Sequence, residues 1–330
     1  MRASEAGDGG SSQMSKRAWI LFIAVGVIWG LPYFFIRIVV RDVEPGTLIF
    51  LRTALASAIL VPIAIRRRRW TSLRGHLLPL LGYTAGEMAI PWLLLANAEE
   101  KVASSFTGLV IAIVPLIAAV IAVSLGTEKL GRRRIAGLFV GVVGVVVLVG
   151  VDVSGTNLVS IFELLGCAIG YATAPVIVSR KLADVPAFEV VAASVLLTAL
   201  AYLPFGVTHL PARLHAETAW SIVALAVLCT VIAFMLFFAL IKEIGPARAV
   251  VVTYVNPAVA ILLGVLALNE PFSLGLALGF PLILLGSVAA TWVKRPSAID
   301  ADRVAAETPS VAPAEVCPSA SLTNEEAAFS

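Results

Sequence analysis

The chain has 330 residues, of which 59% are hydrophobic and 14% are charged, and its formal net charge is +3 with a mean hydropathy of +0.97. A soluble domain has roughly 45–50% apolar residues, so this excess excludes an ordinary water-soluble fold and predicts an all-α polytopic membrane protein. The three cysteines are far apart and the three histidines lie in polar breaks. Neither a disulfide framework nor a metal site is therefore expected.

Ten apolar segments follow a polar start. Residues 1–17 are expected to be a disordered cytoplasmic N-terminus without a cleavable signal peptide, and residues 296–330, rich in Ala, Ser, Pro and acidic residues, a disordered cytoplasmic tail. A bilayer core about 30 Å thick needs about 20 apolar residues per helix. The predicted spans are Ala18–Val40, Gly46–Ile65, Leu77–Asn97, Val102–Leu125, Arg134–Val151, Leu158–Ser179, Ala187–Thr208, Ala219–Ile241, Ala247–Leu268 and Phe272–Val293.

Lysine and arginine are distributed unevenly between the breaks. If the N-terminus is inside, the inner breaks hold 19 of the 24 basic residues and the outer breaks hold 3. The positive-inside rule then places both termini in the cytoplasm of a multi-pass protein of the cell membrane. The runs "RRRRW" and "GRRR" are explained as membrane anchors, so no nucleic-acid partner is expected.

The two halves of the chain repeat each other. Two stretches 142 residues apart align without a gap, which predicts a first five-helix repeat over residues 18–153 and a second over 154–295. Because five is odd, the second repeat enters the membrane from the opposite side, as in many secondary transporters. The structural repeat pairs are Pro115 with Pro257, Glu128 with Glu270, Gly137 with Gly279 and Gly144 with Gly286, and earlier Gly26 and Gly30 with Gly166 and Gly170.

A family resemblance rests on these features. Each half ends in a proline, twelve residues, a glutamate and two glycines, and the first half contains "VIWGLPYFFIRIVV" and an arginine in "LIFLRTALASAIL". In order and spacing these resemble the EamA-type proteins of the drug/metabolite transporter superfamily, over nearly the whole chain except both tails. The resemblance implies a ten-helix exporter or exchanger of small metabolites. Helices one to four and six to nine would surround a central cavity, while five and ten would be peripheral.

Three or more residues from the end of any predicted span, four charged residues remain: Arg37, Arg52, Glu87 and Glu163. Such a residue costs about 2.5–3.5 kcal/mol on insertion scales and normally faces a cavity or a partner. At 1.5 Å per residue, Glu87 lies about 15 Å deep, near the midplane, and Arg52 about 9 Å below the outer end of its helix. We expect Glu87 to bind substrate or a proton, held near Arg52. The alternative is a structural ion pair of Glu87 with Arg52 or Arg37.

Aromatic and polar residues at similar depths are candidates for the cavity wall, since such rings can stack on an apolar or cationic solute. About half of them are expected to line it, and the rest to pack in the core. Besides Tyr83, these candidates are Trp29, Tyr33, Trp92, Tyr171, Tyr254 and Asn256. Glu128 and Glu270 occupy equivalent helix ends, which favours an architectural role such as capping the next helix.

The leading prediction is a secondary transporter of a small metabolite or drug-like solute that works by alternating access. The chain has no GxxxxGK[ST] loop for ATP, and no cofactor is expected. The resemblance favours efflux, while proton coupling through Glu87 stays open. The alternatives are a non-transporting scaffold and an intramembrane enzyme, for which no HExxH or GxSxG motif is present. The expected partners are the solute and the bilayer, with a homodimer through helices five and ten left open.

Overall fold

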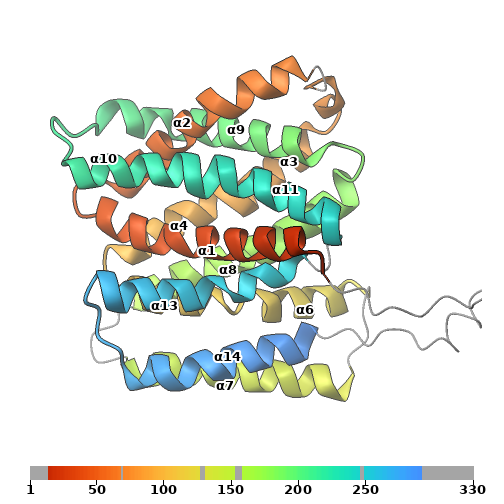
Figure 1. The fold of residues 1–330 in the computed structure, drawn as a ribbon, viewed down its shortest axis with the longest axis vertical. Helices are drawn as coiled ribbons and strands as arrows, with labels where there is room; N and C mark the ends of the chain where they lie inside the picture. Colours follow the sequence, from red (N-terminus) through yellow and green to blue (C-terminus); the bar gives the residue numbers. More distant parts are fainter. Residues whose placement is uncertain (1–13, 68–69, 127–130, 153–157, 246–248, 292–330) are drawn as a thin grey trace, which may run out of the picture. The chain divides into compact units, whose positions relative to one another are not determined.

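The computed structural model describes residues 14–67, 70–126, 131–152, 158–245 and 249–291. In these ranges every regular element is helical, as predicted, and Figure 1 shows the helices running side by side. The elements of the first half are α1 (Lys16–Val39), α2 (Pro45–Arg66), the 3-10 turn η1 (Trp70–Leu73), α3 (Leu77–Thr84), the π-helix η2 (Ala85–Ala89), α4 (Ile90–Glu99), α5 (Ser104–Ile111), α6 (Val114–Ser124) and α7 (Arg132–Asp152).

The second half follows the same order. Its elements are α8 (Leu158–Lys181), α9 (Ala187–Thr208), α10 (Ala216–Val223), the π-helix η3 (Ala224–Ile232), α11 (Ala233–Ile244), the 3-10 turn η4 (Val250–Tyr254), α13 (Asn256–Ala267) and α14 (Leu274–Thr291).

Seven helical stretches are long and apolar enough to cross a membrane, and two shorter apolar helices accompany them near the C-terminal end of the described chain. The count of ten spans and the side on which each end lies stay predictions. The helix α1 begins at Lys16, inside the segment predicted to be disordered, because the Ser15 hydroxyl accepts a hydrogen bond from the Ala18 N–H at 3.0 Å and caps it. Residues 1–13 and the predicted tail at 296–330 lie outside the described residues.

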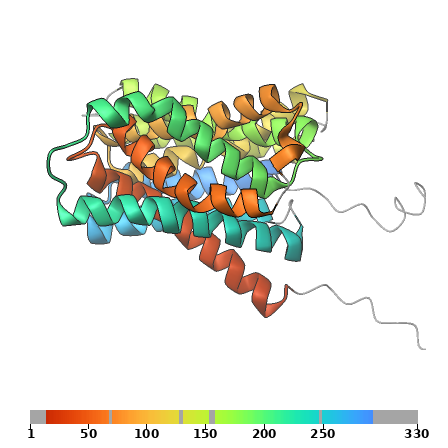
Figure 2. The same cartoon turned by 90° about the horizontal axis from the view of Figure 1, so that it is seen from above.

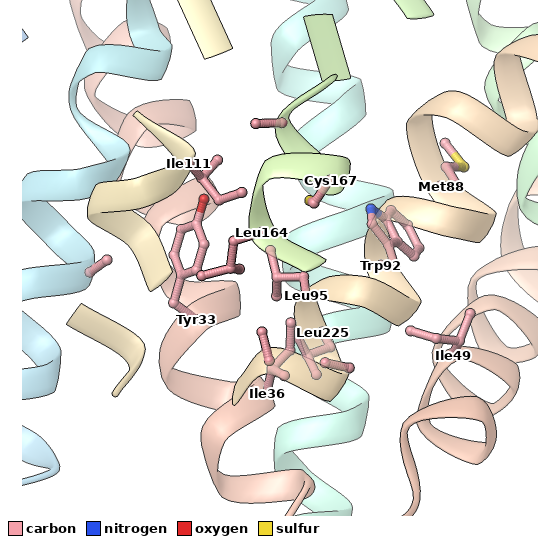
Figure 3. Close-up of a cluster of buried hydrophobic side chains, with 14 of the residues drawn as sticks. Tyr33, Ile36, Ile49, Met88, Trp92, Leu95, Ile111, Leu164, Cys167 and Leu225 are labelled. Carbon is pink, nitrogen blue, oxygen red and sulfur yellow. The ribbon is translucent and has the colours of Figure 1, made fainter. Parts of the chain in front are cut away.

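Three pairs of helices have the most extensive contacts: α7 with α14, α2 with α9, and α4 with α8. In Figure 1, α7 and α14 lie together along one edge, and Figure 2 shows the helices from above. The main apolar core contains residues of α1, α2, α4, α5, α8 and α9. In Figure 3, Tyr33 from α1, Trp92 from α4 and Cys167 from α8 belong to this one cluster.

The helices α7 and α14 approach until their backbones touch. A Cβ atom added at Gly137 would lie 2.5 Å from the Ala290 nitrogen, and one added at Gly286 would lie 2.5 Å from the Gly141 Cα. Small residues allow such approach in membranes, where van der Waals packing holds helices together. These glycines are therefore buried in the α7–α14 contact. A homodimer through these two helices stays a prediction and would use their other faces, which expose residues such as Phe139.

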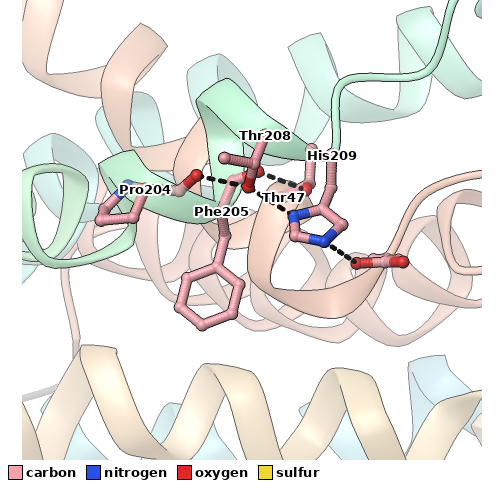
Figure 4. Close-up of polar contacts among 6 residues, drawn as sticks. Thr47, Pro204, Phe205, Thr208 and His209 are labelled. Atoms are coloured by element: carbon pink, nitrogen blue, oxygen red, sulfur yellow. Dashed lines mark hydrogen bonds and ion pairs between the residues drawn. The ribbon is translucent and has the colours of Figure 1, made fainter.

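The contact between α2 and α9 includes polar bonds at one end (Figure 4). The Thr47 hydroxyl donates to the Phe205 carbonyl oxygen at 3.2 Å, and the Thr208 hydroxyl donates to the Pro204 carbonyl oxygen at 2.7 Å. The Thr208 hydroxyl also lies 2.6 Å from His209 Nδ1, and His209 Nε2 lies 4.0 Å from Glu44. Of these, the Thr47–Phe205 bond and the His209–Glu44 contact link the start of α2 to the end of α9, while the Thr208 contacts lie at the end of α9 itself.

An aspartate after the first helix of each half contacts the third helix of the other half. Between α1 and α2, Asp42 accepts a hydrogen bond from the Thr218 hydroxyl in α10, and its Oδ2 lies 2.9 Å from His215 Nδ1. Between α8 and α9, Asp184 Oδ2 lies 3.3 Å from Nε2 of His76, the residue before α3. Asp42 and Asp184 are 142 residues apart, as are His76 and Thr218, so both contacts obey the repeat spacing.

The Asp42 contact makes the stability of the folded protein depend on pH. The hydrogen bond from Thr218, and then that from His215, hold the pKa of Asp42 below its ordinary value. A carboxyl whose folded pKa is depressed stabilises the fold above its unfolded pKa, about 3.9, and this contribution is lost as pH falls through the folded pKa. We expect the Tm to fall on acidification below about pH 4, and to fall less in Asp42→Asn. Glu100→Gln, at an exposed site, is the control. Equal acid dependence in wild type and Asp42→Asn would contradict this.

Candidate functional site

Arg52 of α2 is the central feature of the site. Its side chain is 5% exposed, its Nε donates to the Thr230 hydroxyl of η3 at 3.0 Å, and its Cζ lies 3.7 Å from the centroid of the Trp92 ring. Three helical segments thus meet at one guanidinium. Within the described ranges no carboxylate forms a salt bridge with Arg52. A cation so deeply buried needs an anionic partner or ring faces to offset its lost hydration, and Trp92 supplies one ring face.

One π-helix, η3, contacts this arginine through Thr230, and a second, η2, occupies the position related to it by the repeat. Residues 85–89 of η2 advance by 142 onto 227–231, inside η3, so Glu87 corresponds to Cys229. In a π-helix the backbone hydrogen bonds join residues five apart instead of four, and such segments are frequent at functional sites. In η3 the Thr230 hydroxyl donates to the Leu225 carbonyl oxygen at 2.8 Å, and in η2 the Ala89 carbonyl oxygen accepts from the Tyr202 hydroxyl at 2.8 Å. Both segments therefore satisfy part of their backbone with side chains.

Glu87 is half-buried in η2 and forms no ion pair with Arg52 or Arg37 in the described part of the chain. The alternative of a structural ion pair with Arg52 is therefore not what the described residues show, and the guanidinium stacks on Trp92 instead. Tyr171 of α8 interacts electrostatically with both Glu87 and Arg52. The carboxyl and the arginine thus belong to one polar group of residues that Tyr171 links.

Tyr33 joins this group from α1, and Trp29, Tyr254 and Asn256 have other neighbours. Tyr33 is buried and interacts electrostatically with Tyr171, as Cys167 does. Rings of α11 surround Trp29, with the Phe237 centroid at 4.6 Å and the Phe234 centroid at 5.7 Å.

Tyr254 donates from its hydroxyl to the Ser287 carbonyl oxygen in α14 at 3.2 Å. The Asn256 Oδ1 is buried and has no hydrogen-bond partner among the described residues. Pro257 and its repeat partner Pro115 each lie in the first turn of a helix that follows a break, α13 and α6.

Sequence reasoning missed Thr230, Cys167 and Cys229. All three are buried, and each lies in an apolar segment that offers no obvious reason to single it out. One signal was available: advancing Glu87 by the repeat spacing reaches Cys229 and, at the next residue, Thr230. Among the described residues, no group of three or more His, Cys, Asp and Glu side chains is placed to hold a metal ion.

Glu270 caps a helix. Its two carboxyl oxygens accept hydrogen bonds from the backbone N–H groups of Ser104 at 2.7 Å and Ser105 at 2.9 Å, at the start of α5. A Cβ atom at Gly264 would lie 3.1 Å from the Glu270 Cδ, so a glycine makes room for this approach. An acidic group at a helix N-terminus satisfies free N–H groups and the helix dipole. Glu128, its repeat partner, lies outside the described residues.

Removing this cap should destabilise the protein. Glu270→Ala leaves two N–H groups without their acceptor, and hydrogen bonds to charged groups contribute about 1.5–3 kcal/mol each. We expect the free energy of unfolding to fall by about 3–6 kcal/mol for the two bonds together, and less in Glu270→Gln, which keeps one acceptor oxygen. Thermal unfolding of the detergent-solubilised protein measures the change, with exposed Glu100→Ala as the control. A Tm for Glu270→Ala equal to that of the control would show that the cap contributes nothing.

The chain matches the EamA-like transporter family model twice, over residues 16–150 and 158–292. It therefore belongs to the EamA-like transporter family. Its relatives include the uncharacterized inner membrane transporter YedA of Escherichia coli (strain K12), 31% identical over 73% of this chain and 79% of YedA. Another is an uncharacterized transporter of Archaeoglobus fulgidus, 23% identical over 82% of this chain and 97% of that protein.

A solved crystal structure, 22% identical in sequence, superposes with a TM-score of 0.61 over 83% of this chain and 96% of its own. This likeness concerns the fold alone. The family and the named relatives are those of membrane transporters rather than enzymes. The protein is a membrane transporter, and the arginine site lies within the part that the family model matches.

Proposed function

We propose that the protein is a secondary transporter that exports a small solute across the cell membrane by alternating access. We further propose that the solute carries a carboxylate or a similar planar anionic group, which binds to Arg52. The observation that carries this proposal is the buried guanidinium without a carboxylate partner among the described residues. The buried guanidinium is neutralised when the solute supplies the anionic group that the described residues do not.

The chemistry of arginine supports this choice of solute. A guanidinium binds a carboxylate through two parallel N–H donors. A buried charge that is left without its partner destabilises the protein. Only the Nε of Arg52 has a described hydrogen bond, to Thr230, so its terminal N–H groups are available to a solute. Trp92 holds the plane of the guanidinium by stacking, which orients those donors before the solute arrives.

Glu87 and Tyr171 supply the remaining chemistry. Glu87 is the group we assign to a proton or to a cationic part of the solute, because it lies in the same polar group as Arg52 without neutralising it. The inverted arrangement predicted for the two repeats supports alternating access, since exchange of conformation between such halves would open one central site to either face. Efflux rests on the resemblance to EamA-type exporters, and proton coupling through Glu87 is the form of energy supply we favour.

Extracellular metabolite profiling tests the proposal. Host cells that express wild type, Glu87→Gln or an empty vector are compared, with insertion of each protein checked by membrane fractionation. We expect a solute with an anionic group to accumulate outside only with wild type. Equal accumulation with Glu87→Gln would remove Glu87 from the mechanism. A non-transporting scaffold predicts no change in any solute on either side of the membrane.

A further inference from the structure

A second buried carboxyl lies at the end of α4, twelve residues after Glu87. Glu99 is 0% exposed, and neither of its carboxyl oxygens has a hydrogen-bond partner in the described part of the chain. Arg37 of α1 donates to the backbone carbonyl oxygen of Glu99 instead of its carboxyl group. That bond caps the C-terminus of α4, where a cation is favoured. None of the described ion pairs includes Glu99.

The surroundings of Glu99 contain further unpartnered polar atoms. Ser104 and Ser105 at the start of α5 are 0% exposed, and their hydroxyl oxygens have no described partner. The Ser104 hydroxyl adjoins Glu270, because a Cβ atom at Gly264 would lie 3.1 Å from both Ser104 Oγ and Glu270 Cδ. We call Arg37, Glu99, Ser104, Ser105 and Glu270 the α4-end cluster. It joins α1, α4, α5 and the connection before α14.

The charged groups near Glu99 have opposite effects on a negative charge at its carboxyl group. Glu270 disfavours a second negative charge there and Arg37 favours it. Deeper in the protein, Tyr33 of α1 and Cys167 of α8 also interact with Glu99. The elements packed against α4 have further titratable groups, while α5 has none. They are Lys16 and Arg17 on α1, Arg52 and Arg66 on α2, Glu87 on η2, and Glu163, Tyr171, Arg180 and Lys181 on α8. Glu100 and Lys101, which follow Glu99, are exposed.

A carboxylate in this position lacks every usual source of stabilisation. It is out of water, it accepts no hydrogen bond from the described residues, and another acidic side chain stands nearby. A buried ionised carboxylate without partners is so costly that the group takes up a proton instead. Glu270 differs, because two backbone N–H groups bind its oxygens.

We propose that Glu99 is a proton-binding site, separate from Glu87, that holds its proton at neutral pH in this conformation. When α4 and α5 separate enough to admit water, the carboxyl gives the proton to a water molecule and becomes a carboxylate that Arg37 can neutralise. Cys167 interacts electrostatically with both Glu87 and Glu99. A coupling of this proton to solute movement rests on the proposed function, whereas the proton site itself does not.

Infrared spectroscopy of the full-length protein in lipid nanodiscs tests the site without any solute. The C=O stretch of a protonated carboxyl is separate from the amide bands, and it shifts when the proton is exchanged for deuterium. We expect wild type at neutral pH to show this band, Glu99→Gln to lose one component of it, and exposed Glu100→Gln to keep the whole band. Glu87→Gln separates the contribution of the other buried carboxyl.

Two further outcomes are informative. Gln has the shape of a protonated Glu, so Glu99→Gln should keep the wild-type Tm, and a variant that fails to fold would show that the charged form is needed and overturn the proposal. An unchanged carboxyl band in Glu99→Gln would also overturn it. Loss of the wild-type band when N-methylglucamine chloride is replaced by sodium chloride would mean that the site takes a monovalent cation. Failure of any of these leaves the solute profiling result intact.

Discussion

Arg52→Gln should abolish solute transport while leaving the protein folded and inserted. The substitution removes the guanidinium that we assign to the anionic group of the solute, but it keeps an amide that can still accept or donate one bond to Thr230. Truncating one partner of a buried charge pair costs about 2–5 kcal/mol, which corresponds to a loss of about 30-fold to more than 1,000-fold in affinity. The measurement is binding or export of the solute identified by profiling.

The chain offers a matched control for this variant. Arg67, at the end of α2, also stacks on a ring, with its Cζ 4.0 Å from the Phe188 centroid, yet it is exposed and outside the site. Arg67→Gln should therefore leave transport unchanged. Arg52→Lys keeps the charge and loses the planar fork, so it should retain part of the activity. Full export by Arg52→Gln would remove this arginine from solute binding.

Gly286→Val should prevent assembly of the fold. A Cβ atom at this position would lie 2.5 Å from the Gly141 Cα and 2.7 Å from the Gly137 carbonyl oxygen, so backbone atoms, which cannot rotate away, occupy the space. Overpacking of well-packed interiors costs about 1–3 kcal/mol and occasionally more, and we expect at least about 3 kcal/mol here because both obstacles are backbone. Detergent extraction followed by size-exclusion chromatography and thermal unfolding measures the loss.

Gly82 provides the comparison. It also lies in a membrane-spanning stretch, but an added Cβ atom would meet only the Ile177 Cδ1 atom at 3.5 Å, an ordinary van der Waals distance. Gly82→Ala should be tolerated and even gain helix stability, since glycine costs about 1 kcal/mol in a helix relative to alanine. If Gly286→Val and Gly82→Ala unfolded at the same temperature, close packing of α7 on α14 would be unimportant for stability.

Much of the architecture was predictable because the signals are strong. The apolar segments coincide with helical elements in the described ranges, and the family model matches twice, as the repeat indicates. The glycines that pair in the repeat lie at close helix contacts: Gly30 of α1 lies against Asn256 and Val259, and Gly170 of α8 lies against Gly86. Because glycine has no side chain, it allows a neighbouring helix to approach closely, and the spacing of glycines therefore indicates where helices pack.

The site was predictable only in part. Arg52, Glu87, Trp92, Tyr33 and Tyr171 were all candidates, but the stacking of Arg52 on Trp92 depends on how α2 and α4 are rotated. A helix that is apolar on all sides carries no periodic signal for that rotation, so a structural Glu87–Arg52 pair stayed open as the alternative to a binding role for Glu87. Trp29 illustrates the same limit, because its depth was predicted while its Phe234 and Phe237 neighbours were not.

Glu99 escaped the sequence analysis for a different reason. It lies just beyond the predicted end of its span at Asn97, in the polar run "AEEK", where acidic residues are ordinarily solvated. The structure instead covers it with α1, α5 and the connection before α14. Helix ends are where hydropathy is least informative, since a short polar stretch can be exposed or enclosed by neighbouring elements.

The most direct test of solute transport through Arg52 uses purified protein in liposomes that contain no ATP. The vesicles are loaded with the solute that profiling identifies, and exchange against labelled solute outside is followed for wild type, Arg52→Gln and Arg67→Gln. We predict exchange with wild type and Arg67→Gln and none with Arg52→Gln. Exchange by Arg52→Gln at the wild-type rate, or no exchange by wild type, would contradict a secondary transporter that binds its solute at Arg52.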